Sequence, residues 1–403
     1  MQITQGDVYW LRNSNINKTY PYITRNETCD VLVIGGGLTG AITAYFLAKE
    51  GANVIVAEKN IVGFGCTSGI PATLEYEIGI DLHRLERAIG AIPARKIYNL
   101  CLDALNKIED IDREFEKNTG FHRKDSLYFT NKFINKQNMA KEFNARKDAG
   151  FNPYFLQNHE LINLNSGILT KNSSGVVNPY LFTQELFNYL SDNFDNVKIL
   201  ENTEIIDIDS GYESVECKTN NNFNISAYKV IFASGFDSLK YMPNIPVNVY
   251  KNFVIVTTPV ENLNKYDVNF TAREATDPYH SIRFTNNNRI IYSGEDAKLT
   301  DRLSDEKYLN NFANDKYKRL FGAMKKTFPN LSNVKIDYTF NTTLVNTKDT
   351  LPIIDEVPNM PNCFFNLGFG TNGILYSIIG GNMLKDAIKG FYTKDMNMFK
   401  IDR

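Results

Sequence analysis

The pattern of apolar and polar positions near the N-terminus predicts a strand, a helix and a second strand. Residues 30–34 are a short apolar run rich in β-branched side chains, which is typical of a parallel strand buried on both faces. A glycine-rich segment follows. Apolar positions then repeat at helical spacing over residues 41–50, and Gly51 is placed to end this helix. Residues 53–57 form the second apolar run. This order predicts a βαβ unit.

Helical and strand-like patterns alternate along the rest of the chain. Helical spacing occurs in segments 84–117, 136–149, 180–193, 305–327 and 374–389, and we expect Pro93 to divide the first of them into two helices. Strand-like patterns occur at 126–130, 197–200, 205–209, 214–218, 229–233, 247–257, 281–285, 289–293, 336–340 and 362–367. The order predicts an α/β fold in which a Rossmann-like domain, built from separate segments, is interrupted by a second domain on an antiparallel sheet.

The composition is that of a globular protein with about two domains. The 403 residues are 43% hydrophobic and 22% charged, which excludes a disordered or fibrous chain. The net charge of −2, without a basic stripe, argues against nucleic acid as a partner. The five cysteines are scattered without a C-x-x-C pair, so neither a disulfide framework nor a metal site is expected.

The sequence shows no sign of a targeting or membrane segment. The N-terminus has neither a basic start nor an apolar stretch, and no apolar run approaches the ~20 residues of a membrane helix. We therefore expect a cytoplasmic protein without a membrane span.

The glycines of the βαβ unit spell Gly35-x-Gly37-x-x-Gly40. Gly35 allows the tight turn out of the strand, Gly37 allows a pyrophosphate to approach the backbone, and Gly40 allows close helix packing. The pyrophosphate would lie at the N-terminus of the helix, where free N–H groups and the helix dipole favour negative charge. Glu58, at the end of the second strand, is placed to accept hydrogen bonds from a ribose. A glycine turn without a nucleotide is the alternative, and the flanking strands and the acid argue against it.

The same fingerprint occurs in proteins that bind NAD and in those that bind FAD, and three further segments favour FAD. Residues 63–68 form a glycine-containing loop after the second strand, and residues 229–235 are a strand that ends in small side chains. Residues 368–373 are a second glycine turn, followed by a helix but by no further strand and acid. We expect this last helix to direct its positive N-terminus at a flavin.

Taken in order, these motifs resemble the FAD-dependent amine and amino-acid oxidases, the group of D-amino-acid oxidase, glycine oxidase and sarcosine oxidase. The resemblance extends to Asn178-Pro179 before a helix, to residues 202–205 and to residues 349–355. It implies an FAD-binding domain of segments 29–82, 168–240 and 335–395, a substrate domain of segments 83–167 and 241–334, and an N-terminal arm of residues 1–28. The cofactor-binding residues that motif and resemblance indicate are Gly35, Gly37, Leu38, Thr39, Gly40, Glu58, Lys59, Gly65, Cys66, Thr67, Ser68, Ile205, Ser234, Gly235, Gly368, Gly370, Thr371, Asn372, Gly373 and Ile374.

The resemblance also implies the reaction. A small amine or amino acid would lose a hydride from the carbon beside nitrogen to flavin N5, the imine would hydrolyse, and oxygen or another acceptor would take the electrons. Gly69 stands where some relatives carry a histidine that attaches the flavin, and Cys66 is a remote alternative, so we expect non-covalent FAD.

Four residues are candidates for the substrate site. Arg283 is a cation for a substrate carboxylate, with an ordinary surface arginine as the alternative, and His280 lies beside it. Tyr76 follows the loop at residues 63–68, and Lys348 precedes the segment 349–355. The neighbours of Tyr76 are Glu75 and Glu77, and an acid in the site would suit a substrate with a second cation, such as a polyamine derivative.

Two other functions fit the same sequence. The first is an NAD-linked dehydrogenase that uses the N-terminal fingerprint, and the second is a non-catalytic subunit that binds FAD. The absorbance of bound flavin separates the first from an FAD enzyme, and anaerobic reduction by amines separates the second.

Overall fold

The computed structural model describes residues 3–15, 18–242, 244–276, 279–331, 333–368 and 370–403. Phe369, in the predicted second glycine turn, and residues 1–2 and 16–17 of the predicted arm lie outside these ranges. In the described part of the chain, none of the helices combines the length and the apolar character needed to cross a bilayer.

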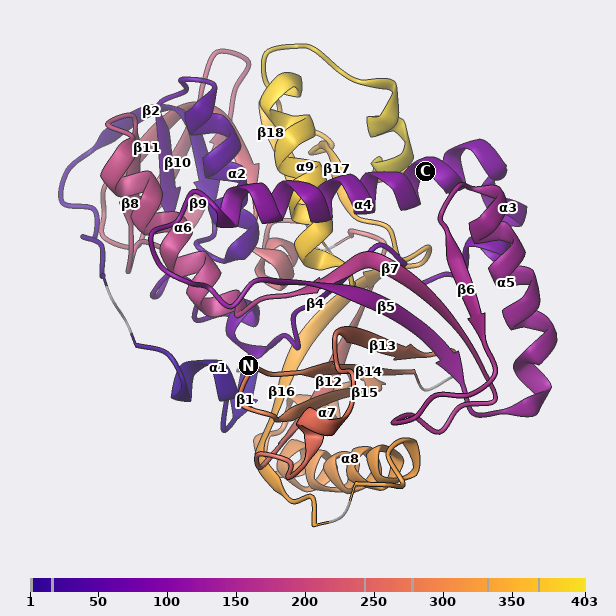
Figure 1. The fold of residues 1–403 in the computed structure, drawn as a ribbon. Helices are drawn as coiled ribbons and strands as arrows, with labels where there is room; N and C mark the ends of the chain where they lie inside the picture. The colour runs from indigo at the N-terminus through magenta and orange to yellow at the C-terminus, as the bar shows by residue number, and fades with distance from the viewer. Residues whose placement is uncertain (1–2, 16–17, 243, 277–278, 332, 369) are drawn as a thin grey trace.

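One layer of the protein is a mostly parallel sheet (Figure 1). Its strands follow the order β17-β18-β11-β2-β3-β8, and all neighbours are parallel except β17 and β18. A ribbon of β9 and β10 extends from β11. The bounds are β2 (Glu27–Ile34), β3 (Val54–Ala57), β8 (Val197–Leu200), β9 (Ile205–Ser210), β10 (Val215–Thr219), β11 (Asn224–Phe232), β17 (Ile353–Glu356) and β18 (Cys363–Leu367).

Helices cover one face of this sheet. They are α2 (Leu38–Lys49), α6 (Pro179–Asn193) and α9 (Gly373–Ala387), and α4 (Ala91–Asp112) packs on α9. Residues 40–48 of α2 are all buried, because α2 packs on the sheet, on α6 and on α9 at once. An apolar helix without a polar face is therefore the expected sequence at this place.

The second layer is a larger, mostly antiparallel sheet in the order β1-β16-β12-β15-β14-β13-β5-β7-β4, with β6 paired to β7 (Figure 1). β13 and β5 are its parallel neighbours. The bounds are β1 (Thr4–Gly6), β4 (Thr73–Glu75), β5 (His122–Thr130), β6 (Pro153–Leu156), β7 (Ser166–Val176), β12 (Val247–Thr257), β13 (Phe270–Glu274), β14 (His280–Phe284), β15 (Ile290–Lys298) and β16 (Ile336–Thr347).

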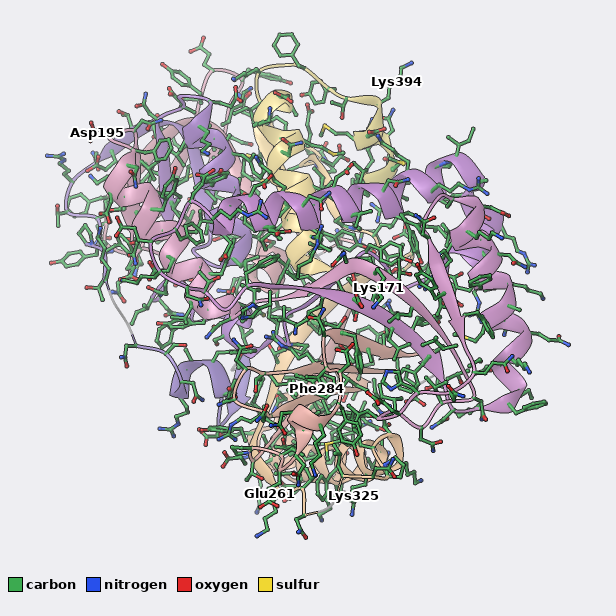
Figure 2. All side chains as sticks on the ribbon, viewed as in Figure 1. Lys171, Asp195, Glu261, Phe284, Lys325 and Lys394 are labelled. Carbon is green, nitrogen blue, oxygen red and sulfur yellow. The ribbon has the colours of Figure 1, made fainter. Side chains whose placement is uncertain are left out.

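The long helix α8 (Glu306–Thr327) covers the outer face of the second sheet, and apolar side chains fill the space between them. Figure 2 shows Phe284 inside this layer and Lys325 on α8 at its lower edge. The remaining elements are α1 (Tyr9–Arg12), α3 (Leu82–Ile89), α5 (Lys136–Asp148), α7 (Asp301–Ser304), η1 (Cys66–Gly69), η2 (Phe133–Asn135), η3 (Gly235–Lys240), η4 (Leu263–Lys265) and η5 (Lys394–Phe399).

The prediction that Pro93 divides the helical segment 84–117 is wrong in its position. The break lies at Gly90, whose φ of 92° belongs to the left-handed region, and Pro93 stands in the first turn of α4. A proline is tolerated there because the first N–H groups of a helix have no partner within the helix.

The two sheets do not follow the expected domain segments at every point. β4 and β16 belong to the large sheet although they lie in segments assigned to the FAD-binding domain, and α4 packs on α9 although it lies in the other domain. The arm contributes β1, which pairs with β16. A local pattern does not indicate which sheet a strand joins, and the domain boundaries stay a prediction.

Candidate active site

The first glycine turn lies between β2 and α2. Gly35 has a φ of 112°, and a Cβ at Gly40 would lie 1.8 Å from the carbonyl oxygen of Gly35. The first N–H of the helix, at Leu38, donates to Thr67 Oγ1 over 3.0 Å. This turn therefore has the tight bend and the close helix packing that its glycines predicted.

Glu58, at the end of β3, lies beside this turn. Its Oε2 accepts from the Gly36 N–H over 2.7 Å and its Oε1 from the Asn60 N–H over 2.8 Å. Burial raises the pKa of Glu58 above the ordinary value. Lys59 forms an ion pair with Asp237 of η3, which joins the end of β3 to the loop that follows β11. The residues after three parallel strands thus meet at one edge of the sheet, where α/β proteins bind their ligands.

The second glycine turn meets the first across this edge. Gly370 has a φ of 84°, and its N–H donates to Val345 O over 2.8 Å. Ser377 in α9 and Thr39 in α2 share a hydrogen bond of 2.7 Å between their hydroxyl oxygens. Asn372 lies just before α9 and donates through Nδ2 to the carbonyl oxygen of Glu75, the last residue of β4, over 2.9 Å and to that of Glu77 over 2.8 Å. Segments more than three hundred residues apart are therefore parts of one site.

A continuous cavity runs between the two layers, with about 1760 Å³ of empty space including its open mouth. All the expected cofactor-binding residues line it except Gly40 and Ser68. Gly40 is at the contact between helix and strand, and the Ser68 hydroxyl donates to Gly65 O over 3.0 Å. Because Gly65 and Gly235 have nothing within 4 Å of an added Cβ, the backbone at both places is open to a ligand. The helix N-termini offer N–H donors, the acid accepts hydrogen bonds, and the open glycines leave room for a ligand. Together these groups fit a dinucleotide such as FAD.

None of the four residues predicted for the substrate site lines this cavity. Arg283 lies beside it and donates through Nη1 to the carbonyl oxygens of Ala72 (2.7 Å), Val177 (2.8 Å) and Pro71 (3.1 Å), with the Trp10 ring 5.0 Å from its guanidinium carbon. These contacts hold the loop after η1 in place. Nη1 of Arg283 is thus occupied by backbone acceptors; its Nε is buried without a partner among the described residues, and the side chain does not line the cavity.

The other three predicted residues point elsewhere. His280 pairs with Glu274 over 2.6 Å on the opposite face of β14 from Ser281, a cavity residue. Tyr76 follows Glu75, so its ring points the other way and packs on Phe151 at a centroid distance of 4.8 Å. Lys348 is exposed. Alternation along β14 places His280 on the face away from the cavity, and Tyr76 and Lys348 follow the ends of β4 and β16.

Sequence reasoning missed Arg273, which lies on β13 and lines the cavity. Its Nη1 donates to Ile78 O over 2.7 Å, and its guanidinium carbon is 5.4 Å from the Tyr279 ring centroid. Its Nε is buried without a hydrogen-bond partner among the described residues. The alternation of Phe270 and Ala272 with polar neighbours was a signal for this strand, but five residues are too few to distinguish it from a loop.

Glu75 also lines the cavity, and its side chain is 6% exposed. Thr271 donates to its Oε1 over 3.0 Å. Burial, together with the nearby charge of Glu77, raises the pKa of Glu75 to about 7. Asn252, on β12, adds a buried Oδ1 with no partner in the described part of the chain. The cavity therefore contains a cation, an acid and an amide acceptor where it adjoins the large sheet.

Comparison with protein families matches residues 30–387 to the family described as FAD dependent oxidoreductase. The chain is 24% identical over 402 residues to a probable oxidoreductase OrdL of Haemophilus influenzae, covering 95% of this chain and 88% of that protein. It is 21% identical over 401 residues to a gamma-glutamylputrescine oxidoreductase of Escherichia coli, covering 94% and 88%.

Solved structures share the fold. A glycine oxidase from Geobacillus kaustophilus superposes with a TM-score of 0.75 at 20% identity, over 94% of this chain and 99% of that one. An L-amino acid deaminase from Proteus vulgaris superposes with a TM-score of 0.74 at 15% identity, over 95% and 100%. Because the family match spans most of the sequence and includes both glycine turns, this chain belongs to the FAD-dependent oxidoreductase family.

Proposed function

We propose that this enzyme oxidises the C–N bond of a small amino acid or amine and that Arg273 binds the substrate carboxylate. The observation that carries the proposal is the buried, unpartnered Nε of Arg273 in the same cavity as the two glycine turns. A buried guanidinium donor without an acceptor is costly, and a bidentate carboxylate is the ligand that matches its geometry. The names of a glycine oxidase and a gamma-glutamylputrescine oxidoreductase among the similar proteins support this substrate class.

Membership in the FAD-dependent family decides against the two alternatives left by the sequence, an NAD-linked dehydrogenase and a subunit without a reaction of its own. The candidate residues Arg283, His280, Tyr76 and Lys348 are not part of the proposal, because they do not line the cavity.

In this proposal, residues at the parallel sheet bind the cofactor and residues of the large sheet bind the substrate. The turns at Gly37 and Gly370 and the carboxylate of Glu58 would hold FAD, which when bound accepts a hydride at N5 of its ring. Arg273 and Tyr279 would orient the substrate from the side of the large sheet. Holding the reacting carbon in a fixed position replaces an encounter in solution with a reaction inside one complex. The imine product would be hydrolysed, and oxygen or another acceptor would take the electrons.

Non-covalent attachment of FAD is part of the proposal. Cys66 lines the cavity, and its Sγ donates to Thr343 O over 3.3 Å. Burial raises the pKa of the Cys66 thiol to about 11, so the reactive thiolate is scarce at neutral pH.

The test is anaerobic mixing of the purified holoenzyme with a panel of amino acids and amines. Bleaching of the flavin absorbance by at least one compound is expected. Arg273→Lys should raise the KM for an amino acid by about tenfold or more with a smaller change in kcat, because a bidentate contact is lost. Arg302→Lys, an exposed arginine on α7, is the matched control and should behave as the wild type. A panel in which no compound reduces the flavin would overturn the proposed function.

A further inference from the structure

The cavity holds two opposite charges that do not neutralise each other. Arg273 donates to a backbone carbonyl oxygen and Glu75 accepts from a hydroxyl, and within the described ranges no ion pair joins the two side chains. Glu75 is buried and Arg273 is half-buried, and each feels the charge of the other only across a distance too long for an ion pair, so the lost hydration is not fully offset. A ligand with a carboxylate at one end and an ammonium group near it, which is an amino acid, would satisfy both.

Hydrogen bonds fix which oxygen of Glu75 faces such a ligand. The Thr271 hydroxyl donates to Oε1, so the 2.5 Å contact between Thr271 and Ser174 has Ser174 as its donor. Both hydroxyl groups are fully buried. While Glu75 is a carboxylate, this chain of donors occupies Oε1, and Oε2 is the oxygen left to receive a proton from a ligand.

The backbone of Glu75 is tied to the cofactor side of the cavity. Asn372, which starts α9, donates to the Glu75 carbonyl oxygen over 2.9 Å, and the next two residues, Gly373 and Ile374, line the cavity. A group bound between Glu75 and Arg273 thus lies beside the helix terminus that faces the cofactor site.

The charged and titratable groups around Glu75 come from each element packed on β4. They are Glu77 in the same segment, Arg146 on α5, Arg273 on β13 and Tyr279 just before β14; α4 contributes Cys101 and Tyr98, and β7 contributes the hydroxyl of Ser174. Burial and then Glu77 raise the pKa of Glu75, while Arg273 and Arg146 lower it, with a balance of about 7. Glu75 is thus protonated below about pH 7 and is a carboxylate above it, the range in which a general base works best.

We propose that Glu75 is the group that removes the proton from the substrate ammonium before the hydride leaves, a role that rests on the function proposed above. An ammonium group has no lone pair to stabilise the carbon from which hydride departs, so the amine must be neutral. In the step, one N–H bond breaks, one O–H bond forms at Oε2, and the electron pair of the broken bond stays on nitrogen. No redox change occurs, and both the substrate amino group and the Glu75 carboxyl group become neutral.

The experiment is the pH dependence of anaerobic flavin reduction, measured at saturating amino acid by stopped flow. In the wild type, the rate constant should rise with pH through neutrality and then level. In Glu75→Gln, reduction at pH 7.5 should be about a hundredfold slower or more. Its rate should still climb tenfold per pH unit into the alkaline range, because solvent then supplies the neutral amine. Glu75→Asp should keep the shape of the wild-type profile at a lower rate.

Glu261→Gln, at an exposed loop position, is the matched control and should leave rate and profile unchanged. A wild-type profile in Glu75→Gln would overturn the proton-transfer role, and so would a rise in KM alone with reduction at saturation unchanged. Either result leaves C–N oxidation standing, because the flavin is still reduced. Only a wild-type flavin that no amino acid or amine reduces counts against the reaction itself.

A second measurement does not depend on turnover. Difference infrared spectra of the holoenzyme without substrate should contain the stretching band of a protonated carboxyl group that is lost near neutral pH, and the band should be missing in Glu75→Gln. A band that disappears already at about pH 5 would overturn the proposal, because a carboxylate that acidic is too weak a base for the ammonium proton.

Discussion

Gly40→Ala provides a direct test of the contact between α2 and the sheet. The new Cβ would lie 1.8 Å from the Gly35 carbonyl oxygen and 3.0 Å from the carbon of the same carbonyl group. Both neighbours are backbone atoms, so no rotamer change relieves the contact. To restore a separation of about 3 Å, the N-terminus of α2 must move outward by roughly 1 Å, which also moves the N–H groups that face the cofactor.

The expected cost is about 3 kcal/mol, the upper part of the range for overpacking. For a chain of this size that corresponds to a melting temperature lower by about 3–5 °C. FAD content, measured as the ratio of flavin to protein absorbance, should fall in the same preparation. The assay is thermal unfolding with and without added FAD, followed by the far-ultraviolet circular dichroism of the backbone.

The matched control is the same substitution in another helix. Gly322 lies in α8 with nothing within 4 Å of an added Cβ. Gly322→Ala should therefore stabilise the protein by about 0.5–1 kcal/mol, because alanine loses less conformational entropy than glycine in a helix. A Gly40→Ala protein that melts at the wild-type temperature and retains its full FAD content would refute the reasoning, since it would show that α2 has room for the side chain.

Two further predictions concern the buried charges and the attachment of the flavin. Although burial opposes it, the charge of Arg146 and hydrogen bonds from His83 lower the pKa of Glu142 to about 2, so its stabilising contribution should be complete above about pH 4.5 and should be lost as the pH falls toward 2. Glu142→Gln should destabilise the protein by about 3 kcal/mol at neutral pH, and denaturant titrations should show this difference shrinking in acid; a difference that stays constant would contradict the assigned pairing. Acid precipitation of the holoenzyme should leave FAD in the supernatant, whereas a yellow pellet that turns colourless in Cys66→Ala would show a covalent bond.

Local chemistry explains how much of the cofactor site the sequence alone could predict. The tight turn at Gly35, the helix start at Gly37 and the acid at Glu58 lie within one βαβ unit, where chain connectivity itself holds them close. The turn around Gly370 is also a local feature, since glycine tolerates the positive φ that the turn requires. These segments all line the cavity, and the roles predicted for them toward the cofactor follow from the residue types.

The substrate side depends on information that no short segment contains. β13 and β14 are antiparallel neighbours in which Arg273 lies opposite Ser281, and this register, together with the position of the cavity, decides which arginine is presented to it. Arg283 belongs to the same face of β14 as Ser281 but lies beyond the cavity, under the carbonyl oxygens of Ala72 and Val177. Both arginines look alike in the sequence.

The sequence by itself thus determined the strands, helices and glycine turns around the predicted dinucleotide site, because backbone conformation and amphipathic periodicity depend on neighbouring residues. Only the tertiary structure decided that Arg273 and Glu75 share one cavity and that β16 belongs to the large sheet. Contacts between residues two hundred positions apart are set by sheet order and register, which result from the packing of the whole chain.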